Sequence, residues 1–160
     1  MTQPTLVLGV DYSDSNRPAL DAAIAAAQEA HARLAIVHAM TPLAAPGLAL
    51  EAPAVLPAAN ESADVLASQR PRAKRWEQRA RDAGLEVEVV NRAGPAAFVV
   101  LEEAQRLGAE GIVVGTHGRT GLAKLFLGSV AKDIVKQSPV PVLVVPQDPA
   151  AMQHVVFPTV

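Results

Sequence analysis

Short apolar runs alternate along the chain with longer segments in which apolar residues recur at helical spacing. Such runs are typical of buried strands, and such segments are typical of helices that present one face to a core. The runs predict strands at residues 5–10, 34–39, 85–90, 111–114 and 141–145. Helical spacing is found at Leu20, Ile24, Ala27 and His31, and over residues 60–83, 95–107 and 129–137.

Strands that alternate with helices predict an α/β fold, in which a doubly wound, five-stranded parallel sheet carries helices on both faces. Sheets of this Rossmann-like kind bind ligands outside the carboxyl ends of their strands, where the strand order reverses. Asp11 follows the first strand and Gly115 ends the fourth. The pattern therefore predicts a site at these two strand ends.

Two segments depart from the regular pattern. Residues 41–59 hold four prolines and one charged residue, which predicts a mobile insertion that covers the ligand site. Pro71 lies inside the helix predicted at 60–83 and is expected to kink or split it. Glu86 and Glu88 alternate with apolar residues in the third strand, which favours a sheet edge. We expect one domain over residues 1–147, followed by a tail at 148–160.

Composition narrows the classes of function. The 160 residues include no cysteine, which excludes thiol catalysis and disulfides, and the net charge of −2 gives no field that would attract nucleic acid. The basic residues between Arg70 and Arg81 are interrupted by Glu77, which favours a solvated helix face. No signal peptide or membrane-spanning run is recognisable. We expect a cytoplasmic protein without membrane or nucleic-acid partners.

The segment after the fourth strand has the composition of a phosphate-binding loop. It reads GTHGRTGLAKLFLGS over residues 115–129, and no acidic residue lies between Glu110 and Asp133. Glycines allow positive φ and close approach of backbone N–H groups to an anion, and a helix amino terminus favours negative charge. From residue chemistry alone, the alternative is a loop with tight turns and Ser129 as an ordinary helix cap. Neither a Walker loop nor a dinucleotide fingerprint is present.

Catalytic constellations are not recognisable in the sequence. His31 and His38 fall on helix and strand positions that favour structural roles, and His154 lies in the tail. His117 lies in the glycine-rich loop and is a candidate donor to a ligand. Asp11 has no partner base in the pattern, so no catalytic residue is predicted.

The spacing Gly115-x2-Gly118-x9-Gly128-Ser129 resembles the ATP-binding motif of the universal stress protein family. The flanking residues 113–119 and 138–146, the first strand and turn, and the second strand are also similar to that family. The resemblance covers nearly the whole chain outside residues 41–59 and the tail, and it implies strand order 3-2-1-4-5. Tyr12 stands where the family frequently has glycine, and Ala39 stands where it usually has valine.

Carried over by position, the resemblance implies a set of ATP-binding residues. Gly118, Gly128 and Ser129 would hold phosphates, Asp11 would lie near the ribose or a magnesium ion on the phosphates, and the Ala39 backbone would meet the adenine. The implied set is Val10, Asp11, Ala39, Gly115, Thr116, Gly118, Arg119, Gly128, Ser129 and Val130. ATP is the implied ligand, with AMP or ADP as alternatives and magnesium as an accompanying ion.

The leading functional interpretation is an ATP-binding regulator of the stress response, with slow hydrolysis at most. One alternative is a dimeric interaction module of the same fold that binds no nucleotide. Another is a slow ATPase or self-phosphorylating enzyme, disfavoured because no activating group is identifiable. The fifth strand, 141–145, is expected at a sheet edge and would join two copies in a homodimer.

Overall fold

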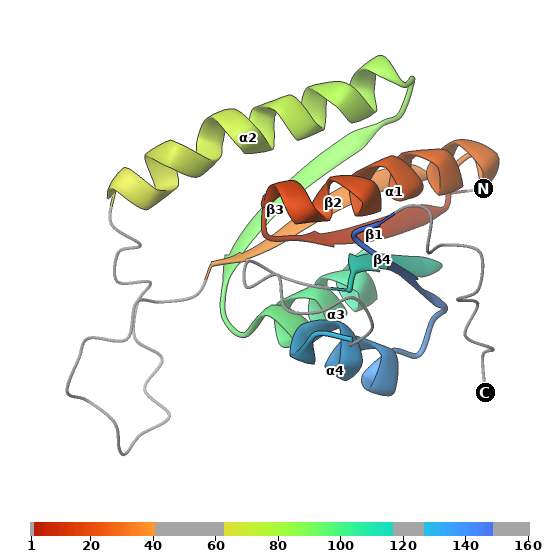
Figure 1. The fold of residues 1–160 in the computed structure, drawn as a ribbon. Coiled ribbons are helices and arrows are strands. Elements are labelled where there is room, and N and C mark those ends of the chain that lie inside the picture. Colours follow the sequence, from red (N-terminus) through yellow and green to blue (C-terminus); the bar gives the residue numbers. More distant parts are fainter. Residues whose placement is uncertain (1, 41–62, 117–126, 149–160) are drawn as a thin grey trace.

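A computed structural model describes residues 2–40, 63–116 and 127–148 of the chain (Figure 1). Within these residues, five strands and four α-helices alternate, and a short 3-10 helix precedes α1. The strands are β1 (Thr5–Val10), β2 (Arg33–Met40), β3 (Val87–Ala93), β4 (Gly111–Gly115) and β5 (Val142–Val145). The helices are η1 (Asp14–Asn16), α1 (Arg17–Glu29), α2 (Ala63–Asp82), α3 (Ala96–Arg106) and α4 (Ser129–Gln137).

The strands form one parallel sheet in the order β3-β2-β1-β4-β5, which confirms the predicted fold class and strand order. β1 is central, and the order reverses between β1 and β4. Gly9 of β1 pairs with Val37 on one side and with Val114 on the other. The carboxyl ends of β1 and β4 therefore lie side by side at the reversal, where ligands of such sheets bind.

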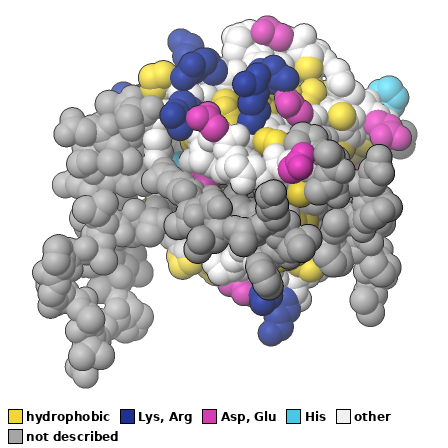
Figure 2. All heavy atoms as spheres, in the orientation of Figure 1, with side chains coloured by type: hydrophobic (Ala, Val, Ile, Leu, Met, Phe, Trp, Pro, Cys, Tyr) yellow, Lys and Arg dark blue, Asp and Glu magenta, His cyan; other side chains and the backbone are white. Residues whose placement is uncertain are grey.

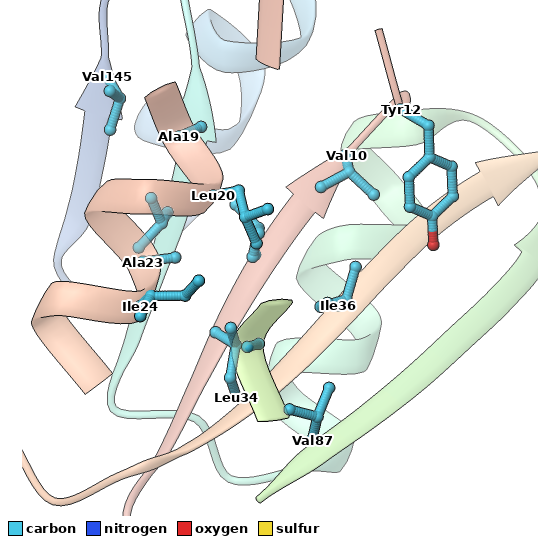
Figure 3. Close-up of a cluster of buried hydrophobic side chains, with 13 residues drawn as sticks. Val10, Tyr12, Ala19, Leu20, Ala23, Ile24, Leu34, Ile36, Val87 and Val145 are labelled. Carbon is cyan, nitrogen blue, oxygen red and sulfur yellow. The ribbon is translucent and has the colours of Figure 1, made fainter. Parts of the chain in front are cut away.

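Two apolar clusters fix the helices on the two faces of the sheet. One unites Leu8, Leu34 and Ile36 with Leu20 of α1 and Ala80 of α2 (Figure 3). The other unites alternate strand residues with buried residues of α3 and α4. Figure 1 shows the same layers, with α1 and α2 on one face and α3 and α4 on the other.

Gly9 sets how closely α3 can approach the centre of the sheet. A Cβ at this position would lie 3.0 Å from Val100 Cγ2 of α3 and 3.2 Å from Val114 Cγ1 of β4. Distances this short displace the neighbouring side chains. Glycine in the central strand therefore lets α3 pack directly on β1, beside the carboxyl ends of the strands.

The structure differs from the sequence-based expectation at three places. Pro71 lies inside a helix that is continuous from residue 63 to 82, so it does not split α2. Pro95 is the N-cap of α3 and precedes its first turn. β3 is at the expected edge, but it begins and ends later than predicted because Val87 pairs with Leu34 and the ladder continues to Met40 and Ala93. The expected insertion at 41–59 and the tail after residue 148 lie outside the described residues.

Candidate functional site

Three backbone segments meet at the carboxyl edge of the sheet, between β1 and β4. Asp11 follows β1, Thr116 follows β4, and neighbouring parallel strands lie roughly 5 Å apart. The Gly128 N–H donates to Thr116 O at 2.6 Å, which holds the start of α4 against the end of β4. The 3-10 helix η1 also contacts β4. The structure therefore brings Asp11, Gly115, Thr116, Gly128 and Ser129 to one edge.

The amino terminus of α4 presents backbone donors at this edge. Gly128 is the N-cap, and the first bond of the helix runs from Lys132 N to Gly128 O at 3.0 Å. The N–H groups of residues 129–131 precede that bond and have no acceptor within the helix. Ser129 is the first helical residue and not the cap, and both Ser129 and Val130 are exposed. The interpretation of Ser129 as an ordinary cap is therefore wrong.

The loop glycines that the structure describes do not have the backbone angles that the sequence analysis expected. Gly128 has a φ of −60° and a ψ of 158°, and the glycines with positive φ in the described residues are Gly84, Gly94 and Gly108. An extended conformation is open to any residue. Glycine at 128 is therefore not required by its φ.

The Asp11 carboxylate is bonded to the turn that follows it. Its Oδ1 accepts from Ser13 N at 2.8 Å and from Ser13 Oγ at 2.6 Å, and Ser13 Oγ lies 2.7 Å from Ser15 Oγ. Within the part of the chain that the structure describes, its buried Oδ2 has no hydrogen-bond partner. Asp11 thus has one carboxylate oxygen occupied by local bonds and one that no described residue bonds.

Tyr12 and α2 form a wall beside Asp11. The Tyr12 ring is buried in the core cluster (Figure 3). Its centroid lies 5.0 Å from that of the His38 ring and 5.6 Å from that of the Trp76 ring. Arg72 Nη1 donates to Tyr12 O at 3.2 Å, so a guanidinium of α2 lies next to the peptide between Asp11 and Ser13. Burial, followed by the negative charge of Glu77, raises the pKa of Tyr12 to about 12. The phenol therefore stays neutral.

The other residues predicted for the site fall into three groups. Ala39 is half-buried near the end of β2, where its backbone is part of the same edge, whereas the Val10 side chain belongs to the core under α1. Gly118, Arg119 and His117 lie outside the described residues. Sequence reasoning did not identify Ser13, Ser15 or Arg72. The alternation Asp-x-Ser-x-Ser after a buried strand was the available signal for the two serines.

The basic residues of α2 match the expected solvated helix face. Figure 2 shows Lys and Arg side chains interspersed with Asp and Glu over the upper surface of the molecule. Arg79 pairs with Asp21 at 2.7 Å, and Arg81 pairs with Glu77 at 2.9 Å. Across residues 2–40, 63–116 and 127–148, no helix is long and apolar enough to cross a membrane.

Comparison with known sequences gives one family. A sequence model of the universal stress protein family matches residues 4–146. Universal stress protein YxiE of Bacillus subtilis is 29% identical over 150 residues, which cover 88% of this chain and 97% of the relative.

Solved structures of that family share the fold. A universal stress protein solved in complex with cAMP is 26% identical, with a TM-score of 0.67, and the match covers 92% of this chain and all of that one. A universal stress protein of Archaeoglobus fulgidus solved in complex with dAMP is 18% identical, with a TM-score of 0.65. That match covers 90% of this chain and 98% of the other.

Proposed function

The chain belongs to the universal stress protein family, and we propose that it binds an adenine nucleotide, ATP foremost, at the carboxyl edge of β1 and β4. Nucleotide occupancy would then set its activity as a regulator in the stress response.

The observation that carries the proposal is the amino terminus of α4, where the N-cap Gly128 has no side chain to cap the helix, beside the end of β4. Three successive N–H groups without helical acceptors, together with the Ser129 hydroxyl, form a set of donors suited to phosphate oxygens. A charge-assisted hydrogen bond contributes about 1.5–3 kcal/mol, and the helix dipole adds about 1 kcal/mol for an anion. Two or three such bonds and the dipole together give about 4–10 kcal/mol, compared with about 8 kcal/mol for micromolar affinity.

The rest of the edge suits the other parts of a nucleotide. The backbone near Ala39, at the end of the adjacent strand β2, would meet the adenine. Gly118 and Arg119 would complete the phosphate loop by analogy with the family motif. Asp11 stands between these two parts of the site, near the ribose or the magnesium ion that accompanies the phosphates. Its Oδ2, to which none of the described residues donates a hydrogen bond, would be the acceptor there.

Magnesium would come to this edge with the nucleotide. The ion usually takes one or two carboxylates, water molecules and substrate phosphates. In the part of the chain that the structure describes, no group of three or more His, Asp or Glu side chains could hold a metal ion. A single carboxylate fits an ion whose remaining ligands are phosphate oxygens and water.

Two solved relatives support the class of ligand, because one is in complex with cAMP and the other with dAMP. The test is to denature protein purified without added nucleotide and to identify what it releases by chromatography. We expect ATP or AMP in a substantial fraction of molecules, or else saturable binding when ATP is added to nucleotide-free protein. Protein that releases no nucleotide and gives no saturable binding would rule the proposal out.

A further inference from the structure

A cavity of about 250 Å³ lies at the amino edge of the sheet, opposite the edge proposed to bind nucleotide. Figure 1 shows that α1 and α2 both end on the side of the sheet where β1 begins. The cavity lies between the segment before β1, the end of α1 and the turn from α2 into β3. Its lining is partly apolar and partly polar and includes Ala27, Ala83, Leu85, Gln3, Gln28 and His31. Ligand pockets usually measure about 300–1,000 Å³, so this one suits a small molecule.

Two glutamine side chains tie the walls of the cavity together. Gln28 Nε2 of α1 donates to Ala83 O in the turn after α2 at 2.8 Å, and Gln3 Nε2 donates to His31 O at 3.2 Å. A side-chain amide that donates through its nitrogen still has its oxygen as an acceptor. None of the described residues donates to Oε1 of either glutamine. These bonds therefore use donors and leave two acceptors at the cavity.

The electrostatic surroundings of the cavity favour a cation. α1 and α2 both end at this edge, and the carboxyl end of a helix carries about half an elementary negative charge. Glu29, Asp82 and Glu86 are exposed, and each adjoins a lining residue in the chain. The cationic side chains nearest in the chain are those of Arg33 and Arg81, and each of them pairs with a glutamate. A ligand with a positive charge is therefore stabilised here, and an anion is repelled.

His31 occupies a backbone position that glycine fits better. α1, α2 and α3 end in the same pair of backbone hydrogen bonds, and the residue after each cap has a positive φ. That residue is Gly84 in α2, with a φ of 86°, and Gly108 in α3, with a φ of 59°, but it is His31 in α1, with a φ of 52°. This conformation strains a residue with a Cβ. Tyr12, the other such residue in the described part of the chain, is buried, whereas His31 is exposed. Strain that burial does not offset indicates a function for the side chain.

We propose that this cavity binds a small organic cation, namely a primary ammonium group on a short aliphatic chain. Such a group has three N–H donors. Three side chains of the cavity accept from it, through Oε1 of Gln3, Oε1 of Gln28 and the unprotonated nitrogen of the His31 imidazole. The alanines and the leucine of the lining contact the aliphatic chain. None of the lining residues that the structure describes has a carboxylate, and amide oxygens with one imidazole are a poor set of ligands for a divalent metal ion.

The experiment is to record amide NMR spectra of the full chain while n-butylammonium is added, and to measure a thermal melt of each variant. Tetramethylammonium is the matched probe, because it carries the same charge without an N–H donor. His31→Gly removes the imidazole and gives α1 the residue type that ends α2 and α3, and Ala83→Leu fills the cavity. Gly108→His is the control variant, because it puts a histidine at the same position of α3, where there is space for a side chain and no contact with the cavity.

We expect n-butylammonium to cause saturable shifts at the lining residues, and tetramethylammonium at equal ionic strength to cause none. Ala83→Leu should abolish these shifts. His31→Gly should weaken binding about tenfold or more, because an acceptor for a charged donor is lost. It should do so without lowering the melting temperature, because glycine relieves the strain. Gly108→His should bind like the parent and melt at a lower temperature.

Shifts that are absent or do not saturate, an equal response to tetramethylammonium, or binding that survives Ala83→Leu would each overturn the proposal. It is overturned as well if His31→Gly binds as tightly as the parent, since the imidazole is then not a ligand. A lower melting temperature for His31→Gly would show that the ring serves the fold, and that result also counts against the site. None of these results bears on nucleotide binding at the opposite edge of the sheet.

Discussion

At the scale of one residue, the backbone conformation at Tyr12 accounts for the glycine that the family frequently has at this position. Its φ is 57°, in the left-handed region that costs a residue with a side chain roughly 1–2 kcal/mol. The conformation persists because the ring is 2% exposed and packs against His38 and Trp76. Complete loss of a buried aromatic side chain costs about 3–5 kcal/mol, so burial outweighs the backbone strain.

Replacing Tyr12 by glycine should therefore destabilise the fold, although glycine suits the backbone. We expect the free energy of unfolding to fall by about 2 kcal/mol or more, measured by urea denaturation. Tyr12→Phe is the matched control and should leave stability nearly unchanged. It keeps the ring and removes a buried hydroxyl that has no hydrogen-bond partner among the described residues. A Tyr12→Gly protein more stable than the parent would contradict this account.

At the scale of elements, a buried carboxylate ties α3 to the edge strand β3. Glu103 of α3 accepts from Arg92 of β3 at 3.1 Å and from Arg106 of its own helix at 2.6 Å, with its side chain 5% exposed. Burial by itself raises the pKa of Glu103, but the hydrogen bonds from Arg106 and Arg92 outweigh it. The net result is a pKa below its ordinary value.

The lowered pKa makes stability depend on pH with a definite sign. The unfolded chain binds the Glu103 proton at a higher pH than the folded chain does, so the contribution to stability is complete above about pH 4.3. It is lost as the pH falls below that value, through the folded pKa. Glu103→Gln should lower stability at pH 7 by about 2 kcal/mol and should flatten the acid limb of the stability curve.

Denaturant melts of parent and Glu103→Gln from pH 7 to pH 3 test this, with Glu102→Gln as the exposed control. Glu102 pairs with Arg92 at the surface, and such pairs contribute little. Equal acid slopes for parent and Glu103→Gln would show that the buried carboxylate is not the source of the pH dependence.

At the scale of the whole molecule, the sequence predicted the architecture because each helix or strand has a recognisable spacing of apolar residues and recognisable residues at its ends. The predicted strand order, which the resemblance to the family implied, was correct. The predicted bounds of α4 were also correct, because Gly128-Ser129 marks its start. The continuity of α2 across Pro71 was not predictable, because packing on the sheet overrides the local cost of proline. The hydrogen bonds of Ser13 depend on a left-handed Tyr12, which no local pattern reveals.

The same topology leaves β5 at an edge of the sheet, and we propose that a second copy pairs there. β5 bonds to β4 on one side only, and Val142 and Leu143 are half-buried. An apolar edge invites pairing, and Pro141 and Pro146 limit it to a short two-fold contact. Light scattering at micromolar concentration should give the mass of a dimer, and Leu143→Lys should shift it to the monomer. A parent protein that is monomeric would contradict the proposal.

The central claim, that the start of α4 holds nucleotide phosphates, is tested most directly by calorimetric titration of ATP into parent and Gly128→Val protein beside a thermal melt. The φ of −60° at residue 128 accommodates valine, so the variant should remain folded. We predict that the parent binds ATP and that Gly128→Val weakens binding well over tenfold, because a side chain there displaces phosphates from two or three backbone donors. Ser129→Ala should cost only about 1 kcal/mol. A folded Gly128→Val protein that binds ATP as tightly as the parent would contradict the account.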